Sequence, residues 1–532
     1  MVPYPKNIVR IGFSGIYSWR PHVEHLYFLS SLVKSAGHEV FFLTCDGDLP
    51  SCYTRELRGR LSFRECLQCR LGGIRSFPVT NIASVGQMAR GDHTSSPSSY
   101  EWAKSSASTL GRFESDEEYS GEAFRLLASR LEPAVSMGFS AAKEWIRHKK
   151  LDAICVFNGR MDVTRAIYEA AKALGVRVVS LERTWFGDGL QILPEENCLG
   201  LRAIDGLVAE WRDRPLTRVQ ALRSAELIAT RFLRTKSTEW RAYNRSAQVV
   251  PWPIENARRK ILLLPGSRNE VWGHADWTSG WVDSRAAYDA IMCQLGLEQR
   301  DVVLRCHPNW SENIGKQDGR RAEDFYSSWA GRVGVLSIPS ASTVSTIGLI
   351  RQCDAIVVTN GSAALEAGIL GKQVIGIGPS TYQEAGIRDR LYSFDDLSKL
   401  RLHATLGADE LSQVKYQLAM RTLRFCYTAS YRIPQYTDSV RAERATKVRF
   451  DEKAVADRFL RLLRTGTLEA DDPTCAMNDM EEKEVLDMIA AEKWSELALM
   501  VPQRDRSLSP LQRRWLYRAI DLAGAMLPAG DR

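Results

Sequence analysis

Several features are missing from this 532-residue sequence, and each absence narrows its class. No run approaches the roughly 18 consecutive apolar residues that a membrane-spanning helix needs. The Lys and Arg residues form no long block, and a formal net charge of +7 over the whole chain is too mild to indicate nucleic-acid binding. The opening MVPYPKNIVRIGFSG lacks the long apolar core and small-residue cleavage site of a secretory signal. We therefore expect a cytoplasmic protein with no nucleic-acid partner, and peripheral association with a membrane stays open.

What the chain does contain is typical of a globular protein, with 44% apolar and 25% charged residues. At about 100–200 residues per domain, its length suits two to four domains. Its eleven cysteines are expected to be thiols or metal ligands, because a reducing compartment disfavours disulfides.

Strand-like runs alternate with helical patterns along most of the chain. NIVRIGFSG and HEVFFLTC, separated by a helical pattern at about 22–36, open a first series, and KILLLPGSRNE opens a second. We predict an α/β protein of the doubly wound class, in which two Rossmann-like domains, 1–250 and 251–400, face a cleft. A helical tail, 401–532, follows. The segment 92–121 is rich in Ser, Gly and charge, and we predict a long surface loop or lid there.

Two loops of the second series follow buried strands and carry groups that can bind an anion. KILLLPGSRNE places Ser267 and Arg268 after a strand, and the planar guanidinium of arginine can bond two phosphate oxygens at once. VVLRCHPN places His307 and Pro308 after the next strand, where an imidazole can donate to a phosphate or protonate a leaving group. A plain turn with a solvated arginine, and a structural histidine, are the alternatives.

The stretch VVTNGSAALEAGILGKQVIGIG holds a third strand end of this kind. Asn360, Gly361 and Ser362 form a polar turn before a predicted helix, whose N-terminus can accept an anion. Glu366 lies one turn into that helix on the same side as Ser362, where a carboxylate can bond both hydroxyls of a ribose. The alternative is a capped helix with an ordinary acidic residue on its edge.

Four of the eleven cysteines lie within 25 residues, in the spacing C-x6-C-x13-C-x2-C. They are Cys45, Cys52, Cys66 and Cys69. This density predicts a structural zinc site with four thiolate ligands. An iron–sulfur cluster and scattered buried thiols are the alternatives.

The PGSR loop, the HP dipeptide and the NGSAALEA…GKQVIGIG block together resemble the C-terminal domain of nucleotide-sugar glycosyltransferases of the GT-B fold, over about 255–395. They look most like the capsule polysaccharide biosynthesis group, which includes bacterial Kdo transferases. The HP and Ser-rich elements are also similar to GT-B sialyltransferases, and the PGSR loop to lipid-A disaccharide synthase. The tail after residue 400 carries no motif of these families.

The resemblance implies that the C-terminal domain binds a nucleotide-sugar donor, which would be a CMP-, UDP- or GDP-sugar. It implies that His307 and Ser362 contact phosphate, that Glu366 contacts the ribose, and that a loop containing Tyr382 closes on the donor. Gln373 stands where a common Gly-Lys-Pro element of the family has proline. We identify no Asp-x-Asp at a strand end, so no metal is expected at the donor site.

The resemblance also implies that the N-terminal domain binds the acceptor. An inverting transferase needs one general base to take the proton of the acceptor hydroxyl. His22 and Glu24, after the first strand, and Glu182, at the end of a later one, are the candidates, and no sequence argument separates them. Further polar residues at strand ends are expected on the acceptor side: Arg20, Asn158 and Arg160.

These observations predict a glycosyltransferase that moves a sugar from a nucleotide-sugar donor to a surface polysaccharide or glycolipid, such as capsule or O-antigen. One alternative is a GT-B-fold sugar-nucleotide epimerase, which binds the same donor but needs no acceptor. Another is a non-catalytic subunit of a polysaccharide assembly complex. The amphipathic stretch near 510–527 permits docking on a membrane, on a partner or on the chain itself.

Overall fold

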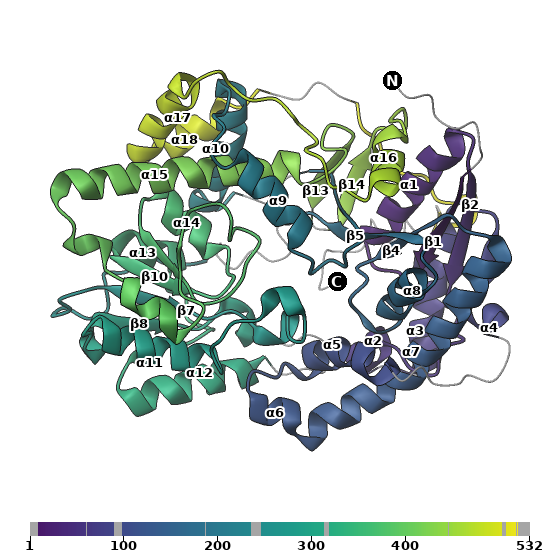
Figure 1. Ribbon diagram of the computed structural model, residues 1–532, viewed down its shortest axis with the longest axis horizontal. Helices are drawn as coiled ribbons and strands as arrows, with labels where there is room; N and C mark the ends of the chain where they lie inside the picture. Colours follow the sequence, from purple (N-terminus) through teal and green to yellow (C-terminus); the bar gives the residue numbers. More distant parts are fainter. Residues whose placement is uncertain are drawn as a thin grey trace.

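The computed structural model describes residues 9–59, 61–89, 98–186, 188–235, 246–312, 319–444, 446–502, 507–517 and 519. Two α/β bodies lie side by side, the first in purple and blue and the second in teal and green (Figure 1). Helices from the middle and the end of the chain run along the upper side of both bodies in that view.

The first sheet has six strands in the order β3-β2-β1-β4-β5-β6. All neighbouring strands are parallel except β5 and β6, and pairs such as Phe13 with Phe42 set the register. Its central strands are nearly continuous apolar runs, as expected where helices cover both faces of a parallel sheet. The strands are β1 (Arg10–Gly15), β2 (Glu39–Thr44), β3 (Ile82–Ser84), β4 (Ala153–Phe157), β5 (Arg177–Arg183) and β6 (Leu190–Pro194).

The helices of the first body pack closely on this sheet. A Cβ atom on Gly12 of β1 would lie 2.5 Å from the ring of Trp145 in α7, so only glycine fits there. The helices are α1 (His22–Ser35), α2 (Tyr53–Arg58), α3 (Ser62–Gly72), η1 (Ile74–Ser76), α4 (Val85–Met88), α5 (Ser99–Gly111), α6 (Asp116–Ser120), α7 (Glu122–Lys149) and α8 (Asp162–Ala173).

The second sheet also has six strands, all parallel, in the order β12-β11-β10-β7-β8-β9. The strands are β7 (Ile261–Leu264), β8 (Val302–Arg305), β9 (Leu336–Ile338), β10 (Ala355–Val358), β11 (Gln373–Gly376) and β12 (Asp389–Arg390). Its helical segments are η2 (Arg268–Glu270), η3 (Ala275–Trp277), α11 (Ser284–Gln294), η4 (Gln299–Asp301), η5 (Pro308–Ser311), α12 (Arg320–Val333), α13 (Thr346–Gln352), α14 (Ala363–Ile369), η6 (Phe394–Lys399) and η7 (His403–Thr405).

The two sheets have the same connectivity. Counted from the start of each series, both follow the order 3-2-1-4-5-6 of a Rossmann sheet. Two such domains confirm the predicted GT-B architecture, an α/β fold with two doubly wound halves.

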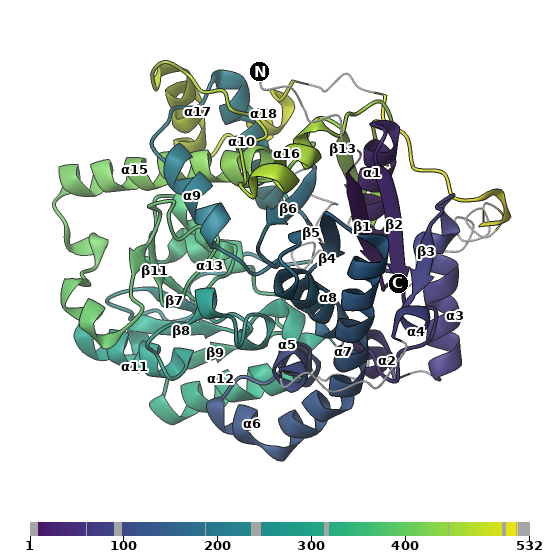
Figure 2. The same cartoon turned by 45° about the vertical axis from the view of Figure 1, so that its right-hand side comes forward.

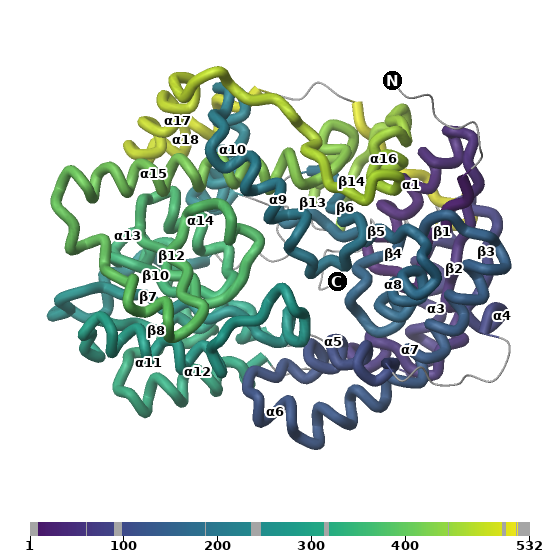
Figure 3. Tube along the Cα trace, viewed as in Figure 1, coloured from purple at the N-terminus to yellow at the C-terminus, as the bar shows by residue number. Residues whose placement is uncertain are grey.

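Long helices connect the two bodies (Figure 3). The chain passes from the first to the second through α9 (Arg202–Trp211) and α10 (Arg218–Phe232), and returns through α15 (Ala408–Tyr427). Beyond α15 the structure is not purely helical as predicted, because a two-stranded antiparallel hairpin follows it. The remaining elements are η8 (Thr428–Arg432), β13 (Val440–Arg444), β14 (Lys447–Phe450), α16 (Asp457–Thr465), α17 (Met480–Ala490) and α18 (Trp494–Leu499).

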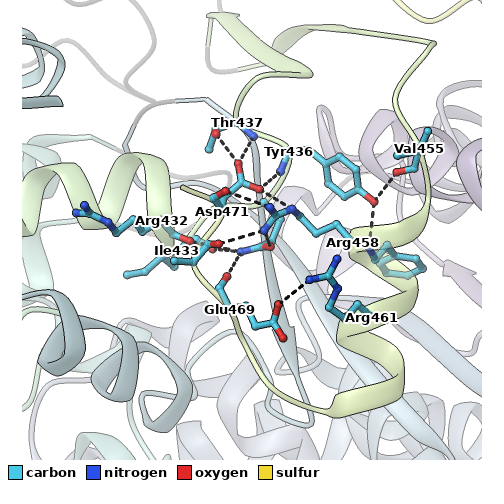
Figure 4. Close-up of polar contacts among 12 residues, drawn as sticks. Arg432, Ile433, Tyr436, Thr437, Val455, Arg458, Arg461, Glu469 and Asp471 are labelled. Carbon is cyan, nitrogen blue, oxygen red and sulfur yellow. Dashed lines mark hydrogen bonds and ion pairs between the residues drawn. The ribbon is translucent and has the colours of Figure 1, made fainter. Parts of the chain in front are cut away.

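The Asp471 carboxylate joins separate segments of the returning chain (Figure 4). Asp471 accepts hydrogen bonds from the backbone N–H groups of Tyr436 and Thr437, at 3.1 and 3.0 Å, and pairs with Arg458 of α16 at 2.9 Å. On the same helix, Phe459 stacks on Phe13 of β1. The end of the chain therefore completes the core of the first body.

The segment predicted as a Ser-rich loop differs from expectation. Residues 92–97 lie outside the described part, and the rest forms α5 and α6. The serines are compatible with these helices because their hydroxyls have specific partners. Ser115 caps α6 in a capping box with Glu118, and Ser106 in α5 accepts a hydrogen bond from Asp162 N at 2.8 Å. The prediction of a long loop was wrong for this part of the chain.

Candidate active site

Both sheets have a point where the strand order reverses, and ligands of such folds bind at the carboxyl ends of the strands there. In the first sheet this point lies between β1 and β4, and in the second between β7 and β10. Beside them, α2 and α5 of the first body and the loops after β7 and β8 of the second meet across an interdomain pocket. Its lining comes from both bodies: Tyr53, Leu57, Thr109, Arg112, Ser267, Asn269, Glu270, Asn309, Trp310 and Ala322.

The structure brings Glu182, Asn158 and His22 together at the edge of the first sheet. Asn158 follows β4 and donates its side-chain amide to Glu182 Oε2 at 2.8 Å, while the backbone N–H of Arg183 donates to Oε1 at 2.9 Å. His22 Nε2 lies 3.4 Å from the same Oε1. Burial raises the pKa of the Glu182 carboxyl above its ordinary value. A carboxyl held in this way can take up a proton from a substrate hydroxyl.

His22 itself is a weak base. Burial, with the nearby charge of Arg183, lowers its pKa to about 3, so its ring is neutral at physiological pH. The ring lies 4.1 Å from that of Phe157, measured between centroids. With Nε2 facing Glu182, His22 acts as a neutral neighbour that orients the carboxyl.

Glu24 and Arg20 lie apart from this group. Two positions along α1 place Glu24 on a different side of the helix from His22. Its carboxylate forms an ion pair with Arg20, whose guanidinium lies 5.9 Å from the centroid of the Phe77 ring. Of the three candidate bases, Glu24 is thus the one with a cationic partner of its own.

Arg160 extends from the same edge toward the pocket wall. Its guanidinium donates to the hydroxyls of Ser105 and Thr109 in α5, each at 3.1 Å. The charge of Arg160 also acts on Glu270, which follows β7 in the second body. The two carboxyl edges therefore face each other, as the predicted fold requires.

Arg268 makes an interdomain contact. Its guanidinium pairs with Asp116 at 2.6 Å and donates to the backbone oxygen of Glu114 at 3.2 Å. The buried Glu114 carboxyl accepts from Arg268 N at 3.1 Å and from the Asn269 side chain at 2.9 Å. Burial raises the pKa of Glu114 to about 8. The arginine predicted as a phosphate ligand thus fixes the loop after β7 to α6.

The PGSR and HP loops lie next to each other. The Trp310 indole donates to the Ser267 hydroxyl at 3.1 Å. His307 caps η5, which begins at Pro308, and its Nδ1 accepts from the backbone N–H of Asn309 at 3.2 Å. The same Nδ1 lies 2.7 Å from Asn309 Oδ1, an acceptor, so the two contacts correspond to different tautomers of the ring. Burial lowers the pKa of His307 to about 4, so the ring is a neutral donor.

The TNGS turn after β10 packs tightly against the PGSR loop. A Cβ atom on Gly266 would lie 2.5 Å from Asn360 Oδ1, so glycine is needed for the two loops to meet. The buried Tyr382 donates its hydroxyl to the backbone oxygen of Gly361 at 3.0 Å. This bond from Tyr382 therefore holds the TNGS turn in place.

Glu366 and Ser362 share one cationic partner that the sequence did not indicate. Arg231 of α10 pairs with Glu366 Oε1 at 2.7 Å and donates to the Ser362 hydroxyl at 3.0 Å. Ser362 makes no side-chain capping bond in α14, contrary to the capping expectation. Arg231 lies 135 residues before Glu366 on a charged helix, and no local motif marks it.

Two hydroxyls at this edge have no partner. The hydroxyl oxygens of Thr359, directly after β10, and Thr381, after β11, are buried and lack a hydrogen bond to any described residue. Buried polar groups are nearly always satisfied in proteins, so such atoms suggest the place of a ligand. Both threonines lie beside residues that the motifs had marked, but neither was identified from the sequence.

The structure does not support the predicted zinc site. Within the described residues, which include all four cysteines, no group of three or more His, Cys, Asp or Glu is arranged to hold a metal ion. The cysteines instead line a pocket of about 580 Å³. Burial raises the pKa of Cys45, Cys52 and Cys69, which favours neutral thiols over thiolate ligands. Cys69 Sγ lies 3.5 Å from the hydroxyl of Ser18, and the thiols line the pocket without converging on one point.

An Asp-x-Asp sequence does follow β2 in the first body, at Asp46 and Asp48. Asp46 forms a bidentate ion pair with Arg75, and Asp48 accepts from Gly86 N at 2.7 Å. These carboxylates are thus occupied by protein groups.

Comparisons with known proteins give only distant similarity. No protein-family model matches the chain. No curated protein sequence matches it either. Solved structures do match at the level of fold. A β-Kdo 2,4-transferase, KpsC of Thermosulfurimonas dismutans, is 14% identical, with 63% of this chain and 87% of that chain covered and a TM-score of 0.31.

Two further solved structures match with similarly low identity and TM-score. The UDP-GlcNAc 2-epimerase of Neisseria meningitidis, bound to UDP-GlcNAc, is 13% identical, with 79% and 96% of the two chains covered and a TM-score of 0.28. The glycosyltransferase SsfS6 of Streptomyces sp. SF2575 is 11% identical, with 78% and 95% covered and a TM-score of 0.21. At such scores the fold assignment depends on the strand order.

None of the helices in the described part of the chain combines the length and the apolar character needed to cross a bilayer.

Proposed function

We propose that the protein is a glycosyltransferase that moves a sugar from a nucleotide-sugar donor to a hydroxyl of a saccharide or glycolipid acceptor. One observation carries this proposal. The carboxyl edge of the first sheet holds Glu182, a carboxyl with a raised pKa, and that of the second sheet holds a carboxylate, a neutral imidazole and buried threonine hydroxyls that lack a partner among the described residues. The first edge suits proton removal from an alcohol, and the second suits recognition of a nucleotide.

On the donor side, Glu366 would accept hydrogen bonds from the ribose hydroxyls, with Arg231 fixing its Oε1. Thr359 and Thr381 would gain the hydrogen bonds that they lack. His307 would donate a ring N–H to a phosphate oxygen, and Asn360 and Gly361 would line the turn beside it. Arg268 is assigned to the interdomain contact with Glu114 and Asp116, and not to phosphate.

On the acceptor side, Glu182 is the proposed base. Its raised pKa brings it closer to neutral pH, whereas a histidine with a pKa of about 3 is a poor proton acceptor. The acceptor oxygen would attack the anomeric carbon while Glu182 takes its proton. The bond from that carbon to the donor phosphate would break, and the nucleotide would leave with the electron pair. Asn158 and His22 position the carboxyl.

The finer assignments belong to the same proposal. The donor would be a CMP-, UDP- or GDP-sugar, bound without a metal ion, and the acceptor a capsule-like polysaccharide or a lipid-linked saccharide. We also propose a cytoplasmic location, where the eleven thiols would stay reduced.

The test is product analysis with a panel of nucleotide sugars, each incubated with and without a mixture of lipid-linked and free oligosaccharide acceptors. The proposal expects nucleotide release and a longer glycan only when an acceptor is present. A changed sugar on the intact nucleotide without acceptor would establish the epimerase alternative. A protein that binds no nucleotide would support the non-catalytic subunit.

A further inference from the structure

An exposed apolar stripe runs along α3 on the first body. Phe63, Leu67 and Leu71 recur at every fourth position and are 79%, 43% and 41% exposed, and Leu61, directly before the helix, is 82% exposed. Such spacing places the side chains on one face of the helix. The opposite side of α3 faces inward, because Cys66 and Cys69 line the pocket under it. Contiguous exposed apolar surface of this kind usually marks an interaction site.

The end of the described chain extends this apolar surface. Residues 507–517 run along the right-hand edge of the molecule in Figure 2, in yellow, close to β3. Arg513 donates to the backbone oxygen of Leu71, and the backbone N–H of Arg514 donates to Ser76 O at 2.9 Å. Trp515 and Leu516, which follow, are 74% and 60% exposed.

The charge around this surface has one sign. The segments 57–75 and 507–517 contain no acidic residue except Glu65, which is buried and pairs with Arg58 at 3.0 Å. The described part of these segments contains six arginines: Arg58, Arg64, Arg70, Arg75, Arg513 and Arg514. Arg58 pairs with Glu65 and Arg75 with Asp46, so the net positive charge comes from Arg64, Arg70, Arg513 and Arg514. Over the whole chain, by contrast, 71 Lys and Arg are nearly balanced by 64 Asp and Glu.

We propose that this surface, made by Leu61, Phe63, Leu67, Leu71, Trp515 and Leu516 with the arginines around them, binds the surface of a membrane that contains anionic phospholipid. Exposed aromatic and leucine side chains enter the boundary between headgroups and acyl chains, and arginines attract the anionic headgroups. A second copy of the chain fits less well, because a two-fold contact would set arginines against arginines. The inference does not depend on the proposed function, since binding to vesicles can be measured without any sugar transfer.

The orientation of the surface has a consequence for the acceptor. Arg70 of α3 lines the same pocket as Gly15, Ile16 and Tyr17, which end and follow β1. His22, five residues after Tyr17, contacts Glu182. A protein docked through α3 would hold the acceptor side of its active site close to the bilayer, which suits a lipid-linked acceptor.

The experiment is co-sedimentation of the full chain with vesicles of phosphatidylcholine alone and with about 30% phosphatidylglycerol added, at low and at high salt. We expect binding to the anionic vesicles only, with a loss at high salt because the charges are then screened. Apolar variants on the surface should weaken binding by at least about tenfold through loss of inserted side chains. They are the pairs Leu61→Ser with Phe63→Ser and Trp515→Ser with Leu516→Ser.

Matched controls make the same kinds of substitution at exposed positions outside the proposed membrane-binding surface. Met477→Ser with Leu499→Ser alters side chains that are 100% and 86% exposed outside the surface, and should leave vesicle binding unchanged. For charge, Arg64→Glu with Arg70→Glu should abolish binding, whereas the exposed control pair Arg332→Glu with Arg401→Glu should not. Circular dichroism checks that each variant is folded.

Three results would overturn the proposal. One is wild-type protein that does not sediment with anionic vesicles at low salt. Another is an equal loss of binding in the surface and control pairs. The third is a dimer, seen by sedimentation velocity, that the Leu61→Ser, Phe63→Ser pair dissociates, since the surface would then be a contact between copies. Vesicle binding in a protein that proves inactive on every sugar donor would uphold this inference while the proposed function fails.

Discussion

The two sheets of this protein have the same strand order but opposite chemistry at their carboxyl edges. The first edge gathers groups that titrate, with the Glu182 carboxyl raised in pKa beside the neutral ring of His22. The second edge gathers hydroxyls, a neutral imidazole and the Glu366 carboxylate, which pairs with Arg231 at 2.7 Å. Burial alone makes a carboxyl weaker as an acid, and a cation beside it reverses that effect.

This difference teaches how one topology can serve two roles. At Glu182 burial outweighs the charges of Arg183 and Arg160 and raises the pKa, which suits proton exchange, whereas the Glu366 carboxylate is paired directly with Arg231 and suits hydrogen-bond acceptance. The contact between Glu114 and Arg268 joins the two halves of the molecule. Four changes test the comparison, in order of decreasing expected effect.

The largest effect is expected from Glu182→Gln. Without a base for the acceptor hydroxyl, kcat should fall by about 10²–10⁴-fold while nucleotide affinity stays the same. Steady-state kinetics and nucleotide titration measure the two quantities. Glu24→Gln is the control, because that carboxylate is paired with Arg20, and it should lower kcat by only a few-fold. Equal losses in both variants would remove the distinction drawn between the two glutamates.

Arg231→Met should destabilise the protein strongly. It leaves Glu366 as a charge that is almost fully buried and has lost its ion pair, which typically costs about 3–5 kcal/mol of unfolding free energy. Arg177→Met, which breaks the more exposed pair with Glu195, should cost less than about 1 kcal/mol. Denaturant unfolding of the two variants measures the free energy of unfolding that each one loses. Similar costs would mean that Glu366 is held by other groups.

Thr359→Val and Thr381→Val should each weaken nucleotide binding by about five- to tenfold, the worth of one hydrogen bond. Unlike most core changes, they should leave Tm equal or higher, because a buried hydroxyl without a partner is removed. Thr54→Val removes a similar hydroxyl in the first body. It should leave nucleotide affinity unchanged and should not lower Tm. If nucleotide affinity is unchanged in all three, the donor does not reach these hydroxyls.

The smallest effect on activity is expected at Glu114. Its folded pKa of about 8 lies above its ordinary value of 4.5, so the folded state holds a proton that the unfolded state has already released. Stability from this group is therefore lost as pH rises from about 4.5 to 8, and stays constant above that. Glu114→Gln should gain in Tm relative to wild type across this window, by several degrees at its upper end.

Thermal unfolding between acidic and mildly alkaline pH measures this difference. Asp116→Asn, an exposed neighbour on the same contact, is the control and should show no such trend with pH. A Glu114→Gln variant that instead loses stability as pH rises would mean that the carboxylate is stabilised in its charged form by Arg268.

Much of the fold followed from local patterns in the sequence. Apolar runs that end in polar turns predicted the strands, and the turns at Ser267, His307 and Asn360 were correctly placed at carboxyl ends. The helices α5 and α6 were missed because serine was taken as a loop former. The capping box of Ser115 and Glu118 was a visible signal for α6.

Other features had no local signal. Cysteine density predicted a metal site, but coordination needs convergence of side chains that spacing alone does not specify. Arg231 reaches Glu366 only because the chain crosses from one body to the other between them. The engagement of Arg268 by Asp116 likewise joins residues of different domains. Such partners depend on tertiary structure, and the sequence patterns describe only neighbours along the chain.

The measurement that tests the central claim most directly is thermal stabilisation by CMP, UDP, GDP, ADP and dTDP in wild type, Glu182→Gln and Glu366→Gln. A nucleotide at a hundredfold its dissociation constant should add about 2.7 kcal/mol of stability. We predict that one nucleotide stabilises wild type and Glu182→Gln equally and Glu366→Gln little or not at all. No stabilisation of wild type by any nucleotide, or an equal loss in both variants, would contradict the division of roles between the two edges.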